Sequence, residues 1–298
     1  MGIPAQALGR TAGDAVAQAS ARRLMAFAAG IGADDPCYFD DLRPEGIVGH
    51  PAFCASLEWP VVSGADYRAA LGRPAGGPRG TVHVQQDSHF HRPIRSGEAL
   101  RTSARVVQIR QTGAGALVTC RIDTLAAESG EKVVTSWSAG MFLRETVDGE
   151  PAAGEEPPAL RADAAVATAV TSAPASVVPI QTEHGLAHRY TECADIWNPI
   201  HTELSAAKAL GLPAIILHGT CTWALAGQEL IRAVGGGDPR KLRRLAGRFK
   251  AMVFPGDRLS LEFARAVGSA GAGVSWQFAV RTPRGDLAIT HGVAEFDA

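Results

Sequence analysis

Two kinds of hydrophobic pattern follow one another along this chain, and the succession occurs twice. Apolar stretches at about 47–60 and about 217–234 have the length and spacing of helices. Shorter stretches are rich in β-branched residues and alternate apolar with polar positions, as strands do. We expect such strands at 100–110, 116–127, 132–144, 259–267, 273–282 and 287–296. A central helix wrapped by a curved antiparallel sheet would bury both patterns in each half, which predicts an α+β fold.

The repeated order of signals indicates an internal duplication. "DDPCYFDD" in the first half corresponds to "WNPIHTE" in the second, and the matched prolines, Pro36 and Pro199, lie 163 positions apart. Residues 148–180 are rich in Ala, Pro and Glu and show neither period, as is typical of a linker. We therefore expect an N-terminal half at 1–147, a linker at 148–180 and a C-terminal half at 181–298.

Composition narrows the class of protein. The chain has 298 residues, 46% of them hydrophobic, and a formal net charge of -1, so nucleic acid is not an expected partner. No apolar run approaches the roughly 20 residues that cross a bilayer, so we expect no membrane association and a cytoplasmic location. The five cysteines are widely spaced without a CxxC pair, which indicates neither a disulfide framework nor a zinc ribbon.

The stretch "ADIWNPIH" gathers Asp195, Asn198 and His201 around one proline. Pro199 disfavours helix at Asn198, so we expect an extended loop leading into a short helix near Thr202 or Glu203. His201 is a candidate proton donor or acceptor, because its ordinary pKa of about 6.5 shifts easily in either direction. The alternative is structural: Asp195 and Asn198 cap a turn, and His201 lies at the surface.

The segment "ILHGTCTWAL" places His218 and Gly219 directly before a long apolar helix. The first amides of a helix are unpaired and carry partial positive charge, and glycine allows close backbone approach. A carbonyl oxygen that gains negative charge would be stabilised there, as thioester enolate chemistry requires. The alternative is that Gly219 only allows tight helix packing.

Together these motifs resemble the MaoC-like, or hydratase 2, family of (R)-specific enoyl-CoA hydratases and dehydratases, which have the hot-dog fold. The family pattern is roughly Y-x-x-S-G-D-x-N-P-[LI]-H-x-[DE] followed by P-I-L-H-G, and the chain has "YTECADIWNPIHTE" and "AIILHGTCTWAL". The stretches "VFPGDRL" and "FHRPIRSGEAL" extend the resemblance over nearly the whole chain. It implies a double hot-dog, with a curved antiparallel sheet around a central helix in each half.

The resemblance also implies an activity and its residues. The reaction would be reversible hydration of an enoyl thioester to a (3R)-hydroxyacyl thioester, in fatty acid or polyketide metabolism. Asp195 would activate the water, His201 would protonate the α-carbon, Asn198 would position the pair, and the Gly219 amide would bind the oxyanion. Tyr190 and His218 would contribute to substrate binding. No cofactor is implied beyond CoA or phosphopantetheine as substrate carrier, so the partner would be an acyl-CoA or an acyl carrier protein.

One departure concerns spacing. The family places aspartate five residues before histidine, whereas Asp195 lies six before His201; the five-residue separation of Tyr190 and Asp195 matches the pattern. We therefore expect one inserted residue, at Ile196, absorbed as a bulge. Without a bulge, Asp195 would point away and His201 would act alone or in another reaction.

The first half has Tyr38 where the second has His201. A phenol with an ordinary pKa of about 10 is a poor acid or base near neutral pH. We therefore expect a degenerate first half that shapes the acyl tunnel, one active site per chain, and a homodimer.

Other candidates are weaker. His89 and His91 share one face of an expected strand but lack a third ligand at a convincing spacing, so we expect no metal. The basic run "DPRKLRRLAGRFK", with Arg243 and Arg244, could bind CoA phosphates or an acidic carrier helix, or could be a solvated face. GxSxG, P-loop and GxGxxG motifs are absent from the sequence.

Two hypotheses follow. The first is an enoyl-thioester hydratase or dehydratase. The second is a repurposed hot-dog protein that binds or cyclises an acyl or polyketide intermediate without hydration. A hot-dog thioesterase is a further enzyme alternative, but the pairing of NPIH with LHG favours water addition.

Overall fold

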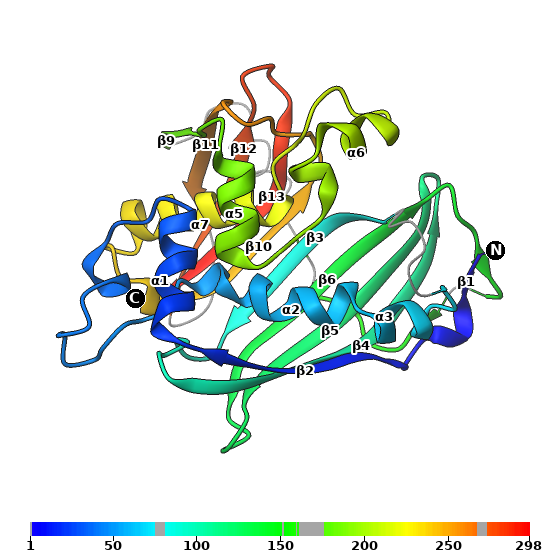
Figure 1. Ribbon diagram of the computed structural model, residues 1–298, viewed down its shortest axis with the longest axis horizontal. Helices are drawn as coiled ribbons and strands as arrows, with labels where there is room; N and C mark the ends of the chain where they lie inside the picture. The colour runs from blue at the N-terminus through cyan, green and yellow to red at the C-terminus, as the bar shows by residue number, and fades with distance from the viewer. Residues whose placement is uncertain (1, 75–80, 151, 159, 161–175, 267–272) are drawn as a thin grey trace. The chain divides into compact units, whose positions relative to one another are not determined.

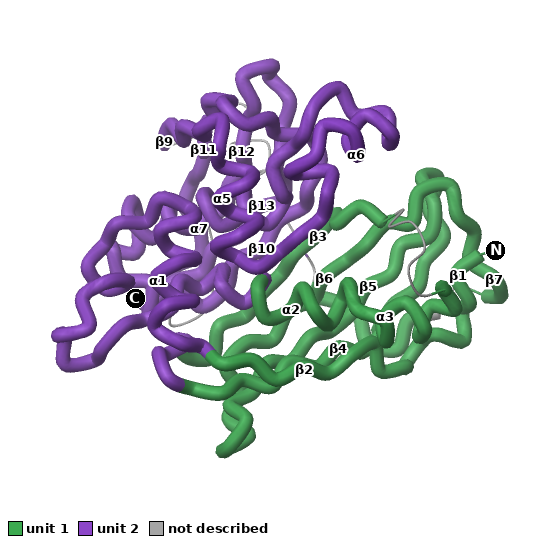
Figure 2. The backbone as a smooth tube through the Cα atoms, in the orientation of Figure 1, with its two compact units in different colours: residues 1–18, 56–92, 98–159 green, residues 19–55, 93–97, 160–298 purple. Residues whose placement is uncertain are grey.

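The computed structural model describes residues 2–74, 81–150, 152–158, 160, 176–266 and 273–298. These residues form two compact units (Figure 2). Unit 1 contains residues 1–18, 56–92 and 98–159, and unit 2 contains residues 19–55, 93–97 and 160–298. The segment 19–55 therefore belongs to the same unit as the C-terminal half. The sequence-based boundaries at 147 and 181 stay a prediction.

Unit 1 is built on an antiparallel sheet with the strand order β2-β4-β5-β6-β3. Its long strands are β2 (Thr11–Ala19), β3 (Thr81–Phe90), β4 (Glu98–Thr112), β5 (Gly115–Ala126) and β6 (Lys132–Leu143). Short strands are β1 (Ile3–Pro4), which pairs with β7 (Val147–Asp148), and β8 (Ala152–Ala153), which pairs with β4. The helices are η1 (Ala5–Ala7), α2 (Cys54–Ser63) and α3 (Ala65–Ala70).

Helices α2 and α3 run across one face of this sheet (Figure 1). Burial largely alternates along β4, as its apolar and polar pattern predicts, whereas residues 115–120 of β5 are all buried. The buried cluster comprises Ile3, Ala7, Ala12, Val61, Leu71, Ala104, Val106, Ile109, Ala116, Val118, Cys120, Ile122 and Phe142.

Unit 2 has a second antiparallel sheet, with the strand order β10-β13-β12-β11-β9. The strands are β9 (Ser176–Gln181), β10 (Leu242–Phe249), β11 (Arg258–Arg265), β12 (Gly273–Arg281) and β13 (Leu287–Asp297). The α-helices are α1 (Ala21–Gly30), α5 (Leu186–Ala194), α6 (Leu204–Ala209) and α7 (Gly219–Val234). Short 3-10 helices are η2 (Pro36–Tyr38), η3 (Pro51–Phe53), η4 (Pro199–His201) and η5 (Pro239–Lys241).

Helix α7 is the central helix of unit 2. Every residue from Cys221 to Gln228 is buried, so the helix is enclosed on all sides over these turns. A Cβ atom at Gly227 would lie 2.7 Å from Leu245 Cδ2, so the glycine allows α7 to approach β10 closely. An apolar helix held against an antiparallel sheet confirms the predicted α+β class.

Helices α1 and α5 pack against each other within unit 2. A Cβ at Gly30 would lie only 2.6 Å from Cys193 Cβ, and the rings of Phe27 and Tyr190 meet at 5.9 Å. Both pairs are separated by 163 positions, the distance between the matched prolines. The two copies of the repeated segment therefore contact each other through equivalent positions.

The expected strands all have counterparts in the described residues, whereas the expected linker does not lack structure throughout. Residues 152–153 form β8, and residues 176–180 belong to β9, which pairs with β11. Strands pair through their backbones and need no strong alternation of side chains. The Ala- and Pro-rich sequence around β8 and β9 therefore did not identify them as strands. Residues 161–175 lie outside the described residues. Within the described ranges, no helix is long and apolar enough to cross a membrane.

Candidate active site

His201 lies at the end of η4, and the local sequence explains its position. Asn198 is extended, and its side-chain Oδ1 accepts a hydrogen bond from the Ile200 amide at 3.4 Å. Pro199 then fixes the first backbone angle of the 3-10 turn. The side chain of Asn198 caps this turn, as the structural alternative from the sequence expected, while His201 faces the interior of unit 2 with its pKa lowered by burial.

A main-chain carbonyl sets the tautomer of His201. Its Nδ1 lies 2.8 Å from the carbonyl oxygen of Ile216, and a carbonyl can only accept, so Nδ1 carries the proton. The other ring nitrogen, Nε2, then has the lone pair. Burial lowers the pKa of His201 to about 4, so the ring is neutral near pH 7 and Nε2 is a base.

His218 stacks on His201, with the ring centroids 3.6 Å apart and the planes at 28°. His218 is 3% exposed, and its Nε2 donates to the carbonyl of Ile196 at 3.1 Å. Its Nδ1 has no hydrogen-bond partner among the described residues. Burial, and then the neighbouring His201, hold the pKa of His218 well below its ordinary value, so both rings are neutral.

The pair lies at the N-terminus of α7, because His218 is the residue that precedes Gly219. The amides of Cys221 and Thr222 bond to the carbonyl of His218 at 3.1 and 3.2 Å. The amides of Gly219 and Thr220 precede these bonds and therefore point out of the helix end, where the helix dipole is positive. A Cβ at Gly219 would meet the Phe249 ring at 3.1 Å, so only glycine leaves this end uncrowded.

Asp195 does not face this pair. It is the C-cap of α5 in the left-handed conformation, with φ 55° and ψ 41°, and its side chain is 84% exposed. Its carboxylate lies 3.8 Å from Arg23 Nη2, a long ion pair at the surface. Ile196 follows it, 4% exposed, with its amide bonded to the carbonyl of Thr191 at 3.1 Å. The catalytic role of Asp195 stays a prediction, and this geometry does not favour it.

The first half of the chain explains why Asp195 points away from the two histidines. Gly32, two residues after the end of α1, has φ 72° and lies four residues before Pro36, just as Asp195 with φ 55° lies four before Pro199. A left-handed residue at a helix end is most often glycine, so Asp195 occupies the position of the glycine in the family pattern. Ile196 then occupies the position of the aspartate. The expected bulge between Asp195 and Asn198 stays a prediction, and the equal spacing from the left-handed residue to the proline in both halves does not favour it.

The counterpart of His201 in the first half is Tyr38, which is 1% exposed. Its hydroxyl donates to Gln228 Oε1 at 3.1 Å, and Gln228 Nε2 donates to Asp35 at 2.6 Å. Arg232 continues the network with a 3.2 Å bond to Asp35. Burial raises the pKa of Tyr38 well above its ordinary value, so this phenol stays neutral and is bonded within the protein.

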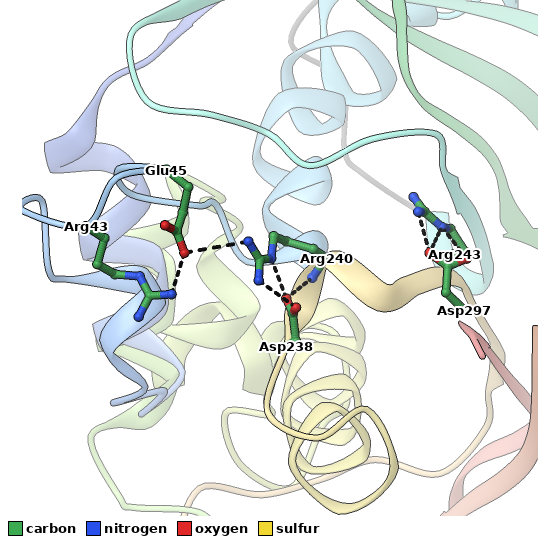
Figure 3. A network of polar contacts seen from close by, with 6 residues as sticks. All are labelled: Arg43, Glu45, Asp238, Arg240, Arg243 and Asp297. Atoms are coloured by element: carbon green, nitrogen blue, oxygen red, sulfur yellow. Dashed lines mark hydrogen bonds and ion pairs between the residues drawn. The ribbon is translucent and has the colours of Figure 1, made fainter.

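The two arginines expected to bind substrate are paired with carboxylates. Arg243 Nε lies 2.8 Å from Asp297, and Arg244 Nη1 lies 3.1 Å from Glu295 (Figure 3 shows the first pair). In the same view Arg240 contacts Asp238 and Glu45, and Glu45 contacts Arg43. Phosphate binding by Arg243 and Arg244 stays a prediction, and a phosphate would have to compete with these carboxylates.

Three further candidate residues from the sequence are Tyr190, His89 and His91. Tyr190 is fully buried on α5, and its ring lies 5.1 Å from that of His218, so it supports the pair from behind. His89 Nε2 lies 3.3 Å from Asp87, and His91 Nε2 lies 3.0 Å from Thr135 Oγ1, both in unit 1. No group of three or more His, Cys, Asp or Glu is arranged to hold a metal ion in the described part of the chain.

Sequence reasoning missed Ile196, Ile216 and Gln228. The carbonyls of Ile196 and Ile216 fix the two histidines, and a main-chain contact leaves no signal in residue type. The sequence did indicate that Ile196 stands where the family pattern has aspartate, because Ile196 is the third residue before Pro199 and the pattern has aspartate third before its proline.

Comparisons with known proteins agree with this architecture. Residues 166–273 match the family model of the MaoC like domain, and residues 6–136 match that of the FAS1-like dehydratase domain region. The chain is 28% identical over 186 residues to the peroxisomal enoyl-CoA hydratase 2 of Arabidopsis thaliana, covering 61% of this chain and 59% of that protein. It is 30% identical over 186 residues to 3-hydroxyacyl-thioester dehydratase Y of Mycobacterium tuberculosis, covering 61% of each. The chain thus matches about three fifths of the length of these relatives.

Solved structures extend the likeness to nearly the whole chain. A MaoC-like dehydratase from Phytophthora capsici has a TM-score of 0.81 at 21% identity, covering 97% of this chain and 95% of that one. Neighbours include a Mycobacterium tuberculosis protein described as a double hotdog fold, with a TM-score of 0.58 at 14% identity, covering 97% and 95%. These likenesses confirm the predicted double hot-dog fold.

Proposed function

We propose that this chain, a MaoC-like protein of double hot-dog fold, is a hydro-lyase that adds water to an enoyl thioester or removes it from a 3-hydroxyacyl thioester. The observation that carries the proposal is the neutral His201, stacked on His218 at the N-terminus of α7. The matches to the MaoC like domain and to relatives named for hydration and dehydration support the same reaction class.

In the proposed reaction, the thioester carbonyl oxygen accepts hydrogen bonds from the first amides of α7, beginning with Gly219. These amides stabilise the negative charge that develops on the oxygen when a nucleophile attacks the β-carbon. His218 orients His201 by ring stacking and is itself held by the carbonyl of Ile196. Tyr190 packs behind His218, so the pair is supported by α5 as well.

His201 alone can complete the proton transfers. Its Nε2 takes a proton from water as the water oxygen bonds to the β-carbon, and the electron pair moves to the thioester oxygen. The imidazolium then gives that proton to the α-carbon, and the enolate collapses to the thioester. Delivery and removal occur on one face of the substrate, which gives syn addition. We extend the proposal to a (3R)-hydroxyacyl product and to CoA or phosphopantetheine as the carrier, with no other cofactor.

The test is turnover of crotonyl, branched and long-chain 2-enoyl-CoA esters by the His201→Gln variant. Gln at 201 can keep a hydrogen bond to Ile216 but cannot shuttle a proton, so we expect kcat to fall about 10²- to 10⁴-fold. Thioester binding, measured by calorimetry, should persist. Asp195→Asn is the matched comparison and should retain activity. Wild-type turnover in His201→Gln would remove His201 from the mechanism, and loss in Asp195→Asn would restore the Asp/His pair.

A second candidate function has one observation in its favour. The main-chain carbonyl of Ile196 contacts His218, and the nearby carboxylate, that of Asp195, is 84% exposed. A site without the second acid/base group would suit a protein that binds or cyclises an acyl intermediate without hydration. Saturable binding of enoyl and hydroxyacyl thioesters, with turnover absent over the whole panel in the wild-type protein, would select this candidate.

A further inference from the structure

The site has one proton-transferring group among the side chains that contact the His201–His218 pair. The N–H group of His218 donates a hydrogen bond to the carbonyl of Ile196. The Tyr190 phenol packs on His218 and is buried, and burial raises its pKa, so it stays protonated. The Thr191 hydroxyl, 3.4 Å from His218 Nε2, is not a base near neutral pH. Ile196 is apolar at the position where the family pattern has aspartate. His201 Nε2 is therefore the one base of this set.

A single base beside an oxyanion site can move a proton between two carbons of the same substrate. Such a shift needs no water, no second acid and no other reactant. Hydration, in contrast, also needs a water molecule held in place, and the apolar side chain of Ile196 offers no hydrogen bond for holding it. The composition of the site therefore suits a carbon-to-carbon proton shift at least as well as water addition.

We propose that the same site also moves the double bond of an enoyl thioester between the 3,4 and 2,3 positions, with His201 carrying the proton. The inference rests on the thioester-binding site of the proposed function. His201 Nε2 takes a proton from the α-carbon of a 3-enoyl thioester, and the electron pair delocalises through the double bond onto the thioester oxygen at the Gly219 amide. The imidazolium returns the proton to the γ-carbon, the 3,4 bond becomes single and the 2,3 bond becomes double. Substrate and product have the same atoms and oxidation state.

The direct experiment supplies the purified chain of residues 1–298 with 3-hexenoyl-CoA and follows the conjugated 2-enoyl product by ultraviolet absorption and mass spectrometry. An isomer keeps the mass of the substrate, whereas a hydrated product gains one water. A parallel reaction starts from 2-hexenoyl-CoA. We expect isomerisation in the first reaction, with a loss of about 10²-fold or more in His201→Gln, as for removal of a proton-transfer group. Glu192→Gln, an exposed change on α5, should leave the rate of isomerisation unchanged.

Isotope transfer separates one base from two. With substrate deuterated at the α-carbon, a single imidazole returns part of the label to the γ-carbon of the product, whereas two separate groups would exchange it with solvent. Retained label supports the inference, and complete washout overturns the one-base shift. This measurement uses the wild-type protein, so it does not depend on whether a variant folds.

Ile196→Asp supplies the carboxylate that the family pattern has. We expect it to raise the ratio of hydration to isomerisation about 10-fold or more, because the carboxylate can hold and activate water. Ile196→Val, which keeps the site apolar, should leave the ratio unchanged, and thermal unfolding of both variants checks that they fold.

The outcomes separate the two proposals. Hydration without isomerisation in the wild-type protein overturns this inference and leaves the proposed function intact. Isomerisation without hydration supports the inference and overturns the hydration proposal. Binding of both thioesters without either reaction overturns both.

Discussion

At the scale of single residues, His201 owes its chemical character to one main-chain contact. The carbonyl of Ile216 fixes the proton on Nδ1, and burial keeps the ring uncharged. A histidine in water would divide its time between two tautomers and, below about pH 6.5, would be mostly protonated. Here the surroundings select one form, and it is the form that can accept a proton at Nε2.

The pH dependence of the reaction should show this environment. His201 must be neutral to act as a base, and its pKa in the folded protein is about 4, below the ordinary value. We therefore expect kcat/KM to be level from neutral pH down to about pH 5 and to fall only as the pH drops through about 4. Samples held at low pH and assayed again near neutrality control for acid unfolding. An acid limb near pH 6.5 would show that a different group titrates.

Asp195 gives a second prediction at this scale. Its left-handed conformation strains an L-residue but not glycine, and its ion pair with Arg23 is long and exposed. Asp195→Gly should leave the free energy of unfolding unchanged or raise it by up to about 1 kcal/mol, with activity retained. Urea denaturation and a hydration assay measure the two quantities. A catalytic base would instead cost about 10²- to 10⁴-fold in rate.

At the scale of elements, the contact between α1 and α5 depends on a missing side chain. Gly30 lies where α1 approaches Cys193 of α5 so closely that a methyl group would overlap it. The two helices carry the two copies of the repeated segment, and each is followed by a left-handed residue before its Pro turn. Their packing therefore determines how both the His201 turn and the Tyr38 turn are supported.

Gly30→Ala tests this contact. Alanine is the better helix former, yet we expect the free energy of unfolding to fall by about 1–3 kcal/mol, because the helices must move apart to admit the methyl group. Gly113→Ala, where nothing lies within 4 Å of the added carbon, is the matched control and should have little effect. Equal stabilities of the two variants in thermal unfolding would show that the α1–α5 contact is loose.

The sequence predicted some of these elements better than others. Strands such as β4 and β12 alternate clearly, and α7 has a long apolar run, so the pattern located them within a few residues. Strand β10 was not recognised within the basic run around Arg243 and Arg244, whose side chains pair with the carboxylates of Asp297 and Glu295 on β13. Helices α1 and α5 were missed, since their short apolar faces pack mainly on each other.

The site was predictable where side chains carry the chemistry and not where the backbone does. The motif located His201, His218 and Gly219 together, and the structure brings them together at the start of α7. It could not reveal that Ile196 and Ile216 hold the rings through carbonyls, since every residue has one. The left-handed angle of Asp195 indicates that Ile196, rather than Asp195, stands where the family pattern has aspartate. Counting back from Pro199 along the sequence gives the same assignment.

At the scale of the whole molecule, unit 2 is assembled from two distant parts of the chain. Residues 19–55 contribute Tyr38, bonded to Gln228 of α7, and Phe27, which packs on Tyr190. Both aromatic side chains from the first half are about 1% exposed. The central helix of the second half is therefore covered in part by the first.

A fragment of residues 148–298 should consequently fail to fold by itself. Without the segment 19–55, α5 and α7 would expose apolar surface and leave Gln228 without its partners, and small domains are only marginally stable. We expect the fragment to lack a cooperative thermal transition in circular dichroism, with the full chain as control. A cooperative transition at the temperature of the full chain would show that the second half is an independent folding domain.

The contact between α1 and α5 also bears on the ancestry of the protein. If the chain descends from the fusion of two copies of one gene, the meeting of Phe27 with Tyr190 and of Gly30 with Cys193 was once an interface between separate subunits related by a two-fold axis. Fusion made that association intramolecular and independent of concentration. In this history, the first copy came to have Tyr38 at the position of His201, while its helix α1 kept the contact with α5. In that case the former subunit interface is buried within one chain, and a homodimer of the present protein would form through a different surface.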